Sequence, residues 1–396
     1  MKKTILFVID SLECAGAEKS LVSLLSLLDY SKYEVDLMLF AHGGVLKDLV
    51  PEEVTTLEPL EYSKFTGLNL KEAITHSIRK FDFKMLFSRV KYSFAIRTEK
   101  GGNTLKARLF WQCNSKVIEK IDKNYDIAIS YSQGIPTFFV SEKVTANKKF
   151  AWVNTTYKLA PKEKEYQKLF YDKMNKIITV SNSAKEAFLE TFPNYNEKTK
   201  VIYDINNYEL ISNLADADNT FDDDFDGLRI LTIGRLANGK GYDIALSACK
   251  KLKEQGVNFR WYVLGEGPLK KEILEYVKEN GLTKHFILLG ITANPYPIIK
   301  KCDIYVQTSR FEGFGLAIAE ARMLNIPVVT TRFDSVYNQM IDEKNGLVVD
   351  MNADAVCNGI MRLIKNSELT QSIISYLKTE KKGNVEEIEK VYELIR

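Results

Sequence analysis

Short apolar runs alternate with helix-length segments along the whole chain, and this alternation constrains the fold more than any other feature. The first run, Thr4–Asp10, is continuously apolar up to Ile9, as in a parallel strand that is covered on both faces. The first half has four more expected strands, at Glu34–Phe40, Asp126–Ser130, Lys149–Val153 and Lys176–Val180. Helical patterns lie between the strands, at Ala17–Leu28, Lys71–Phe81 and Asn182–Thr191. This order predicts βαβ units around a parallel sheet.

The second half of the chain repeats this plan. Its expected strands are Arg229–Ile233, Arg260–Leu264, Phe286–Leu289, Ile304–Gln307, Pro327–Thr330 and Gly346–Val349. Its expected helices are Lys240–Glu254, Leu269–Asn280, Tyr296–Lys300 and Gly315–Leu324. The sequence therefore predicts two doubly wound α/β domains in tandem. We expect a first domain over residues 1–203, a second over 204–380 and a separate C-terminal helix over 381–396.

Composition and charge exclude several classes of protein. Hydrophobic residues make up 45% of the 396 residues and charged residues 27%, which excludes a disordered chain or a multi-span membrane protein. The net charge of +3 is too small for a dedicated nucleic-acid binder. Five scattered cysteines without a CxxC pair predict neither a disulfide framework nor a zinc cage and fit a reducing cytoplasm. Asp10 interrupts the first apolar run, so we interpret that run as a buried strand and not as an export signal.

Two charged segments stand out from this balance. The seam between the domains carries the acidic residues Asp216, Asp218, Asp222, Asp223, Asp224 and Asp226. A DxD metal site is one interpretation, but no strand pattern frames these residues, so we expect a solvated acidic loop. Residues 79–123 instead carry twelve basic and four acidic side chains, a local charge of +8, with aromatic residues between them. This segment predicts a surface that meets anionic lipid or a phosphate-bearing acceptor, while an ordinary solvated helical face is the alternative.

The strongest candidate site follows the expected strand Ile304–Gln307 and runs from Ser309 to Ala321. Its glycine-containing loop leads into a helix, where free amides around Gly313, Phe314, Gly315 and Leu316 can bind a phosphate. Glu312 lies in the loop and Glu320 on the helix, so the two carboxylates can bind two different polyols. Eight residues across a loop and a helix do not make the facing pair of carboxylates that glycoside hydrolysis requires.

Two further turns lie on the same expected edge of the second sheet. Gly234 and Arg235 end one strand, and Lys240 begins the next helix, so two cations are available for a diphosphate. Gly265 and Glu266 belong to a third strand-to-helix turn, which lacks the last glycine of a dinucleotide-binding fingerprint. A nicotinamide-dependent dehydrogenase is therefore disfavoured.

Together these motifs resemble those of the family 4 glycosyltransferases, which have the GT-B fold of two Rossmann-like domains around a cleft. The resemblance covers most of the chain and is strongest over residues 230–346. It implies that Arg235 and Lys240 hold the diphosphate of a nucleotide sugar, that Glu312 holds the sugar and that Glu320 holds the ribose. It also implies that Gly16 approaches the donor from the first domain. The last helix, with Val385, Ile388, Val391 or Tyr392, and Ile395 as its apolar stripe, would cross back onto that domain.

The chain departs from the family pattern at two positions. Ala15 replaces the first glycine of the N-terminal loop, and Asn154 follows the Trp152-Val153 strand where many members have a histidine. Asn154 can contact a sugar or the acceptor but cannot titrate, and we expect none of the three histidines to be catalytic.

The resemblance implies transfer with retention of anomeric configuration, without a metal ion and without a protein base. We expect a hexose-type donor linked to UDP rather than GDP and a glycan or lipid-linked acceptor of surface polysaccharide synthesis. We also expect a cytoplasmic location, with residues 79–123 at the inner face of the membrane and no nucleic-acid partner. The alternatives are a nucleotide-sugar epimerase of the same fold and a non-enzymatic sugar-binding protein.

Overall fold

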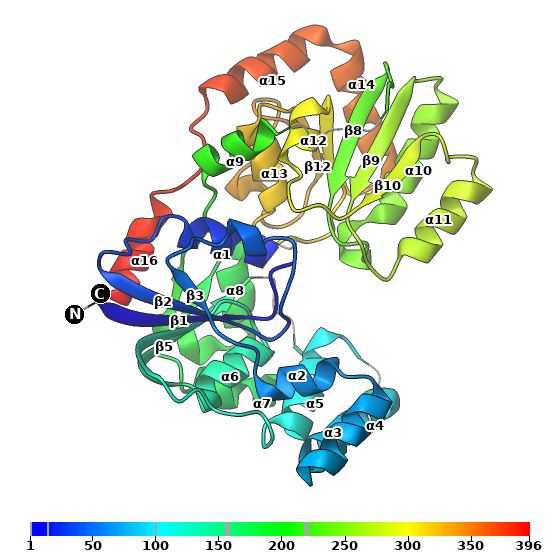
Figure 1. The fold of residues 1–396 in the computed structure, drawn as a ribbon. Coiled ribbons are helices and arrows are strands. Elements are labelled where there is room, and N and C mark those ends of the chain that lie inside the picture. Colours follow the sequence, from blue (N-terminus) through cyan, green and yellow to red (C-terminus); the bar gives the residue numbers. More distant parts are fainter. Residues whose placement is uncertain (1, 14–15, 100, 155–158, 218–220, 222) are drawn as a thin grey trace. The chain divides into compact units, whose positions relative to one another are not determined.

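The computed structural model describes residues 2–13, 16–99, 101–154, 159–217, 221 and 223–396, and it contains two parallel β-sheets (Figure 1). The strand order is β3-β2-β1-β4-β5-β6-β7 in the first sheet and β10-β9-β8-β11-β12-β13 in the second. In both sheets the order reverses beside the first strand, so each sheet is doubly wound. The predicted fold class is confirmed.

The strands of the first sheet are β1 (Lys3–Ile9), β2 (Tyr33–Leu39), β3 (Val54–Thr56), β4 (Asn124–Ser130), β5 (Thr145–Val153), β6 (Lys176–Thr179) and β7 (Thr199–Val201). The strands of the second are β8 (Leu228–Ile233), β9 (Phe259–Leu264), β10 (Phe286–Gly290), β11 (Ile304–Gln307), β12 (Val328–Thr331) and β13 (Leu347–Val349). The α-helices of the first half are α1 (Gly16–Leu25), α2 (Glu61–Gly67), α3 (Leu70–Lys80), α4 (Lys84–Thr98), α5 (Asn103–Asn114), α6 (Ile135–Lys143), α7 (Pro161–Tyr171) and α8 (Asn182–Thr191). Those of the second half are α9 (Tyr208–Ala215), α10 (Tyr242–Glu254), α11 (Lys270–Glu279), α12 (Tyr296–Lys301), α13 (Leu316–Met323), α14 (Ala353–Lys365), α15 (Ser367–Thr379) and α16 (Glu387–Ile395). Short 3₁₀ turns lie at Lys47–Leu49, Pro193–Lys198, Asn238–Lys240 and Val336–Asn338.

The chain forms two compact units. Unit 1 comprises residues 1–13, 24–202 and 389–396, and unit 2 comprises residues 14–23 and 203–388. These units differ from the expected division in two places. Residues 14–23 belong to unit 2, although they lie in the expected first domain, and the chain leaves unit 2 after Ile388 instead of residue 380.

Every central strand of unit 2 is buried on both faces. Ile230 packs in the cluster formed with α10, α11, α14 and α15, whereas Leu231 packs in the cluster formed with α9, α12 and α13. This alternation follows from the two-residue period of a strand, whose successive side chains point to opposite faces. Because the clusters on both faces of the strand are apolar, the strand appears in the sequence as a continuous apolar run.

The first apolar run is a central strand of unit 1. β1 pairs with β2 on one side and β4 on the other, and its residues from Ile5 to Ile9 are at most 1% exposed. The expected buried strand is therefore confirmed.

The C-terminal helix α16 returns to unit 1 and lies beside the N-terminus (Figure 1). The Tyr392 ring stacks on Tyr33 at 6.0 Å between ring centroids, and its hydroxyl donates to the carbonyl of Leu27. Val391 and Ile395 are fully buried, as the expected apolar stripe requires. Val385 was wrongly included in that stripe because it precedes the helix and is 40% exposed.

The acidic seam is not simply a solvated loop. Asp216 forms an ion pair with Lys300, and Asp223 accepts hydrogen bonds from Arg229, Arg260 and Tyr262. Asp223 therefore connects the seam to β8 and β9, and the expectation of a solvated acidic loop was wrong at this residue. Asp218 and Asp222 lie outside the described residues.

Candidate active site

The predicted site lies where the strand order of the second sheet reverses. β8 and β11 are neighbours there, and the loops that follow them continue to α10 and α13. In doubly wound sheets this position opens a crevice beyond the carboxyl ends of the strands, because the two connections leave toward opposite faces.

Two glycines allow these strand ends to approach each other. Gly241 has a φ of +64°, and a Cβ atom there would lie 2.0 Å from the carbonyl oxygen of Thr308. Gly265 has a φ of +155°, and a Cβ atom there would lie 2.0 Å from the carbonyl oxygen of Gly234. Any larger residue would separate the strand ends, so the two glycines allow the turns after β8, β9 and β11 to pack against one another.

Lys240 and Glu312 form an ion pair at this edge. The Lys240 Nζ atom lies 2.6 Å from Oε1 and 2.8 Å from Oε2 of Glu312. The Lys240 side chain is 28% exposed and that of Glu312 is 11% exposed, so the pair can be reached by a ligand. The stem of Lys240 passes over Gly234, where a Cβ atom would lie 3.4 Å from its Cδ atom. The structure thus brings together three residues that the sequence had singled out.

A chain of buried polar residues fixes the Glu312 carboxylate. Its Oε1 atom accepts hydrogen bonds from Ser309 Oγ at 2.6 Å and from Gln307 Nε2 at 3.0 Å. The Tyr305 hydroxyl in turn donates to Gln307 Oε1, so alternate residues from β11 onward form one relay. Ser335 adds a hydrogen bond of 2.9 Å to the Glu312 carbonyl. These supporting residues were not predicted from the sequence, although polar side chains at every second position of a strand end were the available signal.

The helix α13 begins directly after the Glu312 loop. Its N-cap is Gly315, with a φ of +88°, and no side chain caps the first turn. Gln339 donates to the carbonyls of Phe314 and Gly315 and so holds the loop from behind. The amide groups of the first turn, from Leu316 onward, are therefore oriented as in a phosphate-binding helix N-terminus.

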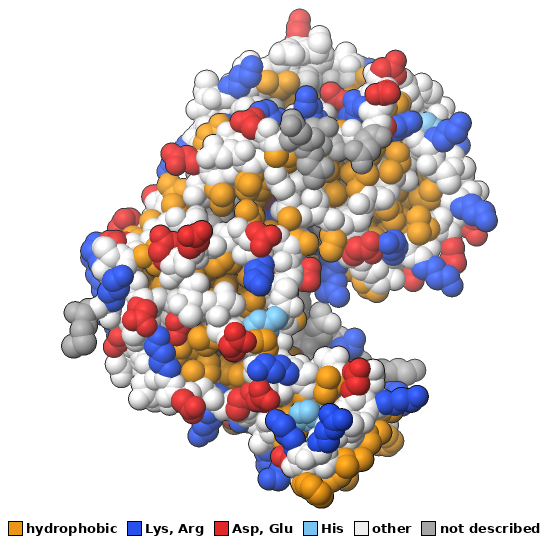
Figure 2. Space-filling view, viewed as in Figure 1, with side chains coloured by type: hydrophobic (Ala, Val, Ile, Leu, Met, Phe, Trp, Pro, Cys, Tyr) orange, Lys and Arg blue, Asp and Glu red, His pale blue; other side chains and the backbone are white. Residues whose placement is uncertain are grey.

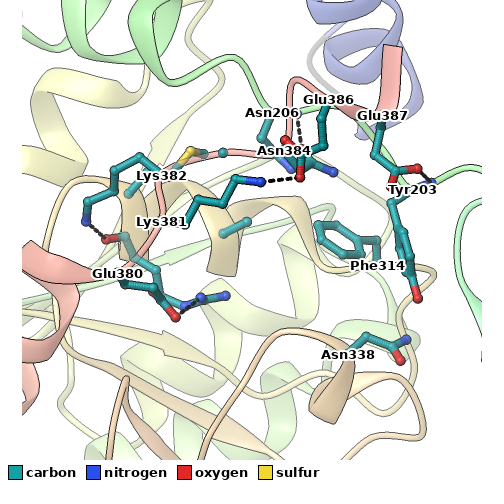
Figure 3. Close-up of a pocket in the computed structure, with 14 residues that line it drawn as sticks. Tyr203, Asn206, Phe314, Asn338, Glu380, Lys381, Lys382, Asn384, Glu386 and Glu387 are labelled. Atoms are coloured by element: carbon teal, nitrogen blue, oxygen red, sulfur yellow. Dashed lines mark hydrogen bonds and ion pairs between the residues drawn. The ribbon is translucent and has the colours of Figure 1, made fainter. Parts of the chain in front are cut away.

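The backbone of Phe314 belongs to this loop, but its side chain lies against a separate cavity. Its ring packs against Tyr203 with 5.9 Å between centroids, and both rings line a cavity of about 300 Å³ (Figure 3). Among the charged side chains that line this cavity, Arg322 pairs with Glu380 and Lys381 pairs with Glu386. Of the predicted site residues, only Phe314 is in its lining.

Glu320 is buried and already bound to one cation and one hydroxyl of the protein. The Lys19 Nζ atom lies 2.9 and 3.0 Å from its two carboxylate oxygens, and Tyr296 donates to Oε1 at 3.1 Å. Gly16, on the same helix as Lys19, lies against Leu316, because a Cβ atom at Gly16 would lie 3.3 Å from its Cδ1 atom. Burial raises the pKa of Tyr305, and the charges of Glu312 and Glu320 raise it further.

Three other predicted residues lie outside the hydrogen-bond network of Lys240 and Glu312. Arg235 is exposed, and its guanidinium makes no hydrogen bond or ion pair with the part of the chain that the structure describes. Glu266 forms an exposed ion pair with Lys270 at 2.6 Å. Asn154 follows β5 in unit 1 and donates to the carbonyl of Tyr131 at 2.6 Å. Gly313 is buried in the Glu312 loop.

Among the described basic residues of the segment 79–123, one is not on the surface. Arg108 is 3% exposed and forms ion pairs with Glu163 at 3.0 Å and with Glu99 at 2.9 Å. It was wrongly counted as part of a basic surface, since it stabilises the packing of α5 on α7. Lys100 lies outside the described residues.

Residues 221–380 match the family described as Glycosyl transferases group 1. The chain therefore carries a group 1 glycosyl transferase domain. This domain contains the Lys240–Glu312 pair, the glycine turns and α13. No helix in the described ranges is both long and apolar enough to cross a membrane. Within those ranges, no cluster of three or more His, Cys, Asp or Glu side chains forms a potential metal site.

Two relatives of this chain are named as glycosyltransferases of bacteria. The chain is 30% identical over 217 residues to N-acetylgalactosamine-N,N'-diacetylbacillosaminyl-diphospho-undecaprenol 4-alpha-N-acetylgalactosaminyltransferase of Campylobacter jejuni, with 54% of this chain and 58% of the relative covered. It is 26% identical over 203 residues to poly(ribitol-phosphate) alpha-N-acetylglucosaminyltransferase of Staphylococcus aureus, with 50% and 38% covered. The matched part thus spans little more than half of the first relative and less of the second.

The fold extends beyond the group 1 domain. The structure of Anabaena Alr3699/HepE in complex with UDP and glucose is similar over 99% of both chains, with a TM-score of 0.66 and 18% identity. Together with the two doubly wound sheets, this likeness shows the GT-B fold.

Proposed function

We propose that this chain is a glycosyltransferase that moves a hexose-type sugar from UDP to a glycan or lipid-linked acceptor in surface polysaccharide synthesis. The observation that carries the proposal is the convergence of Lys240, Glu312 and the start of α13 at one edge of the second sheet. A cation, a fixed carboxylate and free helix amides together match the groups of a nucleotide sugar. The relatives and the GT-B fold support the same assignment.

Each predicted residue has a role in this proposal. Lys240 and Arg235 bind the diphosphate, and the α13 amides beyond Gly313 bind its other oxygens. Glu312 accepts hydrogen bonds from the sugar hydroxyls, and Glu320 accepts those of the ribose. Gly16, Gly234, Gly265 and Glu266 line the donor site, and Asn154 contacts the sugar or the acceptor. Unit 2 is then the donor domain, and unit 1 is the acceptor domain.

The proposed transfer needs no metal ion and no protein base. The bond between the anomeric carbon and the β-phosphate oxygen breaks, and a bond from that carbon to the acceptor oxygen forms on the same face. The departing phosphate oxygen takes the acceptor proton, so the products are UDP and the glycosylated acceptor. The protein then contributes positioning and charge stabilisation, for which each well-placed hydrogen-bond donor supplies roughly 3–4 kcal/mol.

We further propose that unit 1 binds the inner face of the membrane through α3 and α4. Along α3, Leu70, Ile74 and Ile78 are 40–60% exposed at helical spacing. Along α4, Phe87 is 78% and Phe94 is 69% exposed. Figure 2 shows hydrophobic side chains gathered over these two helices, with basic side chains beside them.

An amphipathic face of this kind binds anionic lipid through apolar burial and charge attraction together. The exposed basic residues that flank it are Lys80, Lys84, Lys91 and Arg97. The relative from Campylobacter jejuni has a diphospho-undecaprenol-linked substrate in its name, which supports a membrane acceptor for this chain.

Vesicle co-sedimentation tests the membrane part of the proposal. The protein is expected to bind vesicles of phosphatidylglycerol and phosphatidylcholine more tightly than vesicles of phosphatidylcholine alone. Replacing Phe87 and Phe94 with Ser should abolish this binding, whereas Leu274→Ser, at an exposed leucine of α11, should not. Equal binding by the double variant and the wild type would refute the membrane surface.

Donor turnover tests the enzymatic part. A thermal-shift panel of UDP- and GDP-sugars should select one UDP-sugar, and Lys240→Ala should abolish the shift. Product analysis with that donor then separates the outcomes. Transfer to an acceptor with release of UDP supports the proposal, isomerised donor without acceptor indicates an epimerase, and binding without turnover indicates a sugar-binding protein.

A further inference from the structure

Lys19 is the basic residue that approaches the candidate ribose carboxylate. Its Nζ atom lies 2.9 and 3.0 Å from the two oxygens of Glu320, and 5.3 Å from the centroid of the Tyr296 ring. The Lys19 side chain is 10% exposed and that of Glu320 is 2% exposed. Both residues belong to unit 2.

This pairing leaves the Glu320 carboxylate with too few free lone-pair positions to accept both hydrogen bonds of a ribose diol. A carboxylate offers about four lone-pair positions, and a ribose diol donates two hydrogen bonds. Oε1 already accepts from Lys19 and Tyr296, and Oε2 accepts from Lys19. Three of the four positions are therefore occupied, and a diol that binds both oxygens must replace a hydrogen bond to Oε1, such as the one from Lys19.

The displaced ammonium group would lie near the first turn of α13. Lys19 follows Gly16 by three residues on α1, which is a rise of about 4.5 Å along a helix. Gly16 itself lies against Leu316, the first residue of α13. The first turn of α13 is where the diphosphate binds in the proposed function.

We propose that Lys19 exchanges partners when the donor binds, leaving Glu320 to the ribose and pairing with the diphosphate instead. This inference rests on the proposed function and adds a donor-binding residue to it. In this exchange the ribose hydroxyls replace the hydrogen bonds that the ammonium group gave to the carboxylate, and the ammonium group compensates the charge of the diphosphate. Lys19 then opposes the binding of a nucleoside without phosphate and favours the binding of a nucleoside diphosphate.

Because the two effects have opposite signs, a pair of ligands tests the exchange. We would compare uridine and UDP by NMR titration and calorimetry on the full chain and its Lys19→Met variant. Removal of the competing ammonium should strengthen uridine binding severalfold, while loss of a charge-assisted hydrogen bond should weaken UDP binding about tenfold. The matched control is Lys278→Met, at an exposed lysine of α11, which should leave both affinities unchanged.

Each other outcome contradicts the exchange. If Lys19→Met binds both ligands more weakly than the wild type, Lys19 only holds Glu320 in position. If the variant binds both ligands more tightly, Lys19 only blocks Glu320 and does not pair with the diphosphate. The exchange is also contradicted if Lys19→Met binds uridine no more tightly than the wild type does, or if neither protein binds uridine. If Lys19→Met unfolds, Lys19→Gln repeats the comparison, because glutamine keeps a hydrogen-bond donor without the charge. A wild type that does not bind UDP at all refutes the proposed function itself.

Discussion

The ammonium nitrogen of Lys240 lies 2.6 Å from Oε1 of Glu312, 72 residues further along the chain. The carboxylate is fixed independently by Ser309 and Gln307, so it does not depend on the lysine for its position. A diphosphate can therefore draw Lys240 away from Glu312 without releasing the carboxylate. This relationship separates the expected effects of substitution at the two positions.

We expect Lys240→Met to weaken UDP binding by about 10- to 100-fold, because a hydrogen bond to a charged group contributes roughly 1.5–3 kcal/mol. Glu312→Gln should leave UDP binding nearly unchanged but lower the turnover of the UDP-sugar, since the carboxylate faces the sugar in the proposed function. Calorimetry with UDP and a UDP-release assay measure the two effects. Lys251→Met, which breaks an exposed ion pair of 2.8 Å with Asp354, is the control for loss of a lysine.

The close approach of α10 to β11 predicts a large cost for Gly241→Ala. The new Cβ atom would lie 2.0 Å from the Thr308 carbonyl oxygen at a φ of +64°. Gly256 has a similar φ of +73° but nothing within 4 Å of a Cβ atom. Gly256→Ala should therefore lower the free energy of unfolding by only about 1–2 kcal/mol, the cost of the backbone conformation. Urea unfolding curves in which the two variants are equally stable would contradict the steric argument.

The buried carboxyl of Asp204 predicts a pH dependence of stability. Burial raises its pKa from 3.8 to about 7, while a hydrogen bond from Ser20 opposes the shift. The folded state therefore holds a proton that the unfolded state has lost between pH 3.8 and 7, so stability falls as pH rises through this range. The expected slope for this group is at most about 1.4 kcal/mol per pH unit.

Asp204→Asn should remove that contribution. The variant should be more stable than the wild type at pH 8, and the difference in unfolding free energy should shrink at pH 5. Asp334→Asn, at an exposed carboxyl, is the control. A difference that stays constant between pH 5 and pH 8 would show that Asp204 does not titrate in this range.

Asp223 predicts a pH dependence of stability that is opposite to that of Asp204. Burial favours its neutral form, but hydrogen bonds from Tyr262, Arg229 and Arg260 outweigh burial and lower its pKa to about 2. Its contribution is present above the unfolded value of 3.8 and is lost as pH falls from there toward 2. Asp223→Asn should therefore lower the free energy of unfolding by about 2 kcal/mol at pH 7 and by less at pH 3. Asp224→Asn, exposed in the same segment, should have little effect at either pH.

The sequence by itself determined the central strands of the two doubly wound sheets and about half of the helices, whereas helices such as α4, α6 and α14 were not predicted. A strand buried on both faces is apolar at every position, so Ile5–Ile9 and Ile230–Leu231 were readable without any knowledge of their neighbours. The short edge strands β3 and β7 were missed because three residues with one exposed member carry no such signal. The sequence also placed Lys240, Glu312 and the glycine turns at strand ends.

Only the tertiary structure decided which of these side chains meet. The pairing of β8 with β11 brings Lys240 to Glu312, and the packing of residues 14–23 with unit 2 brings Lys19 to Glu320. It also buries Arg108 among carboxylates, although its sequence neighbourhood is that of a basic surface. The physical reason is that hydrophobic burial is encoded locally, by one residue and its periodic neighbours. An ion pair instead depends on the geometry of two segments that lie far apart in the chain.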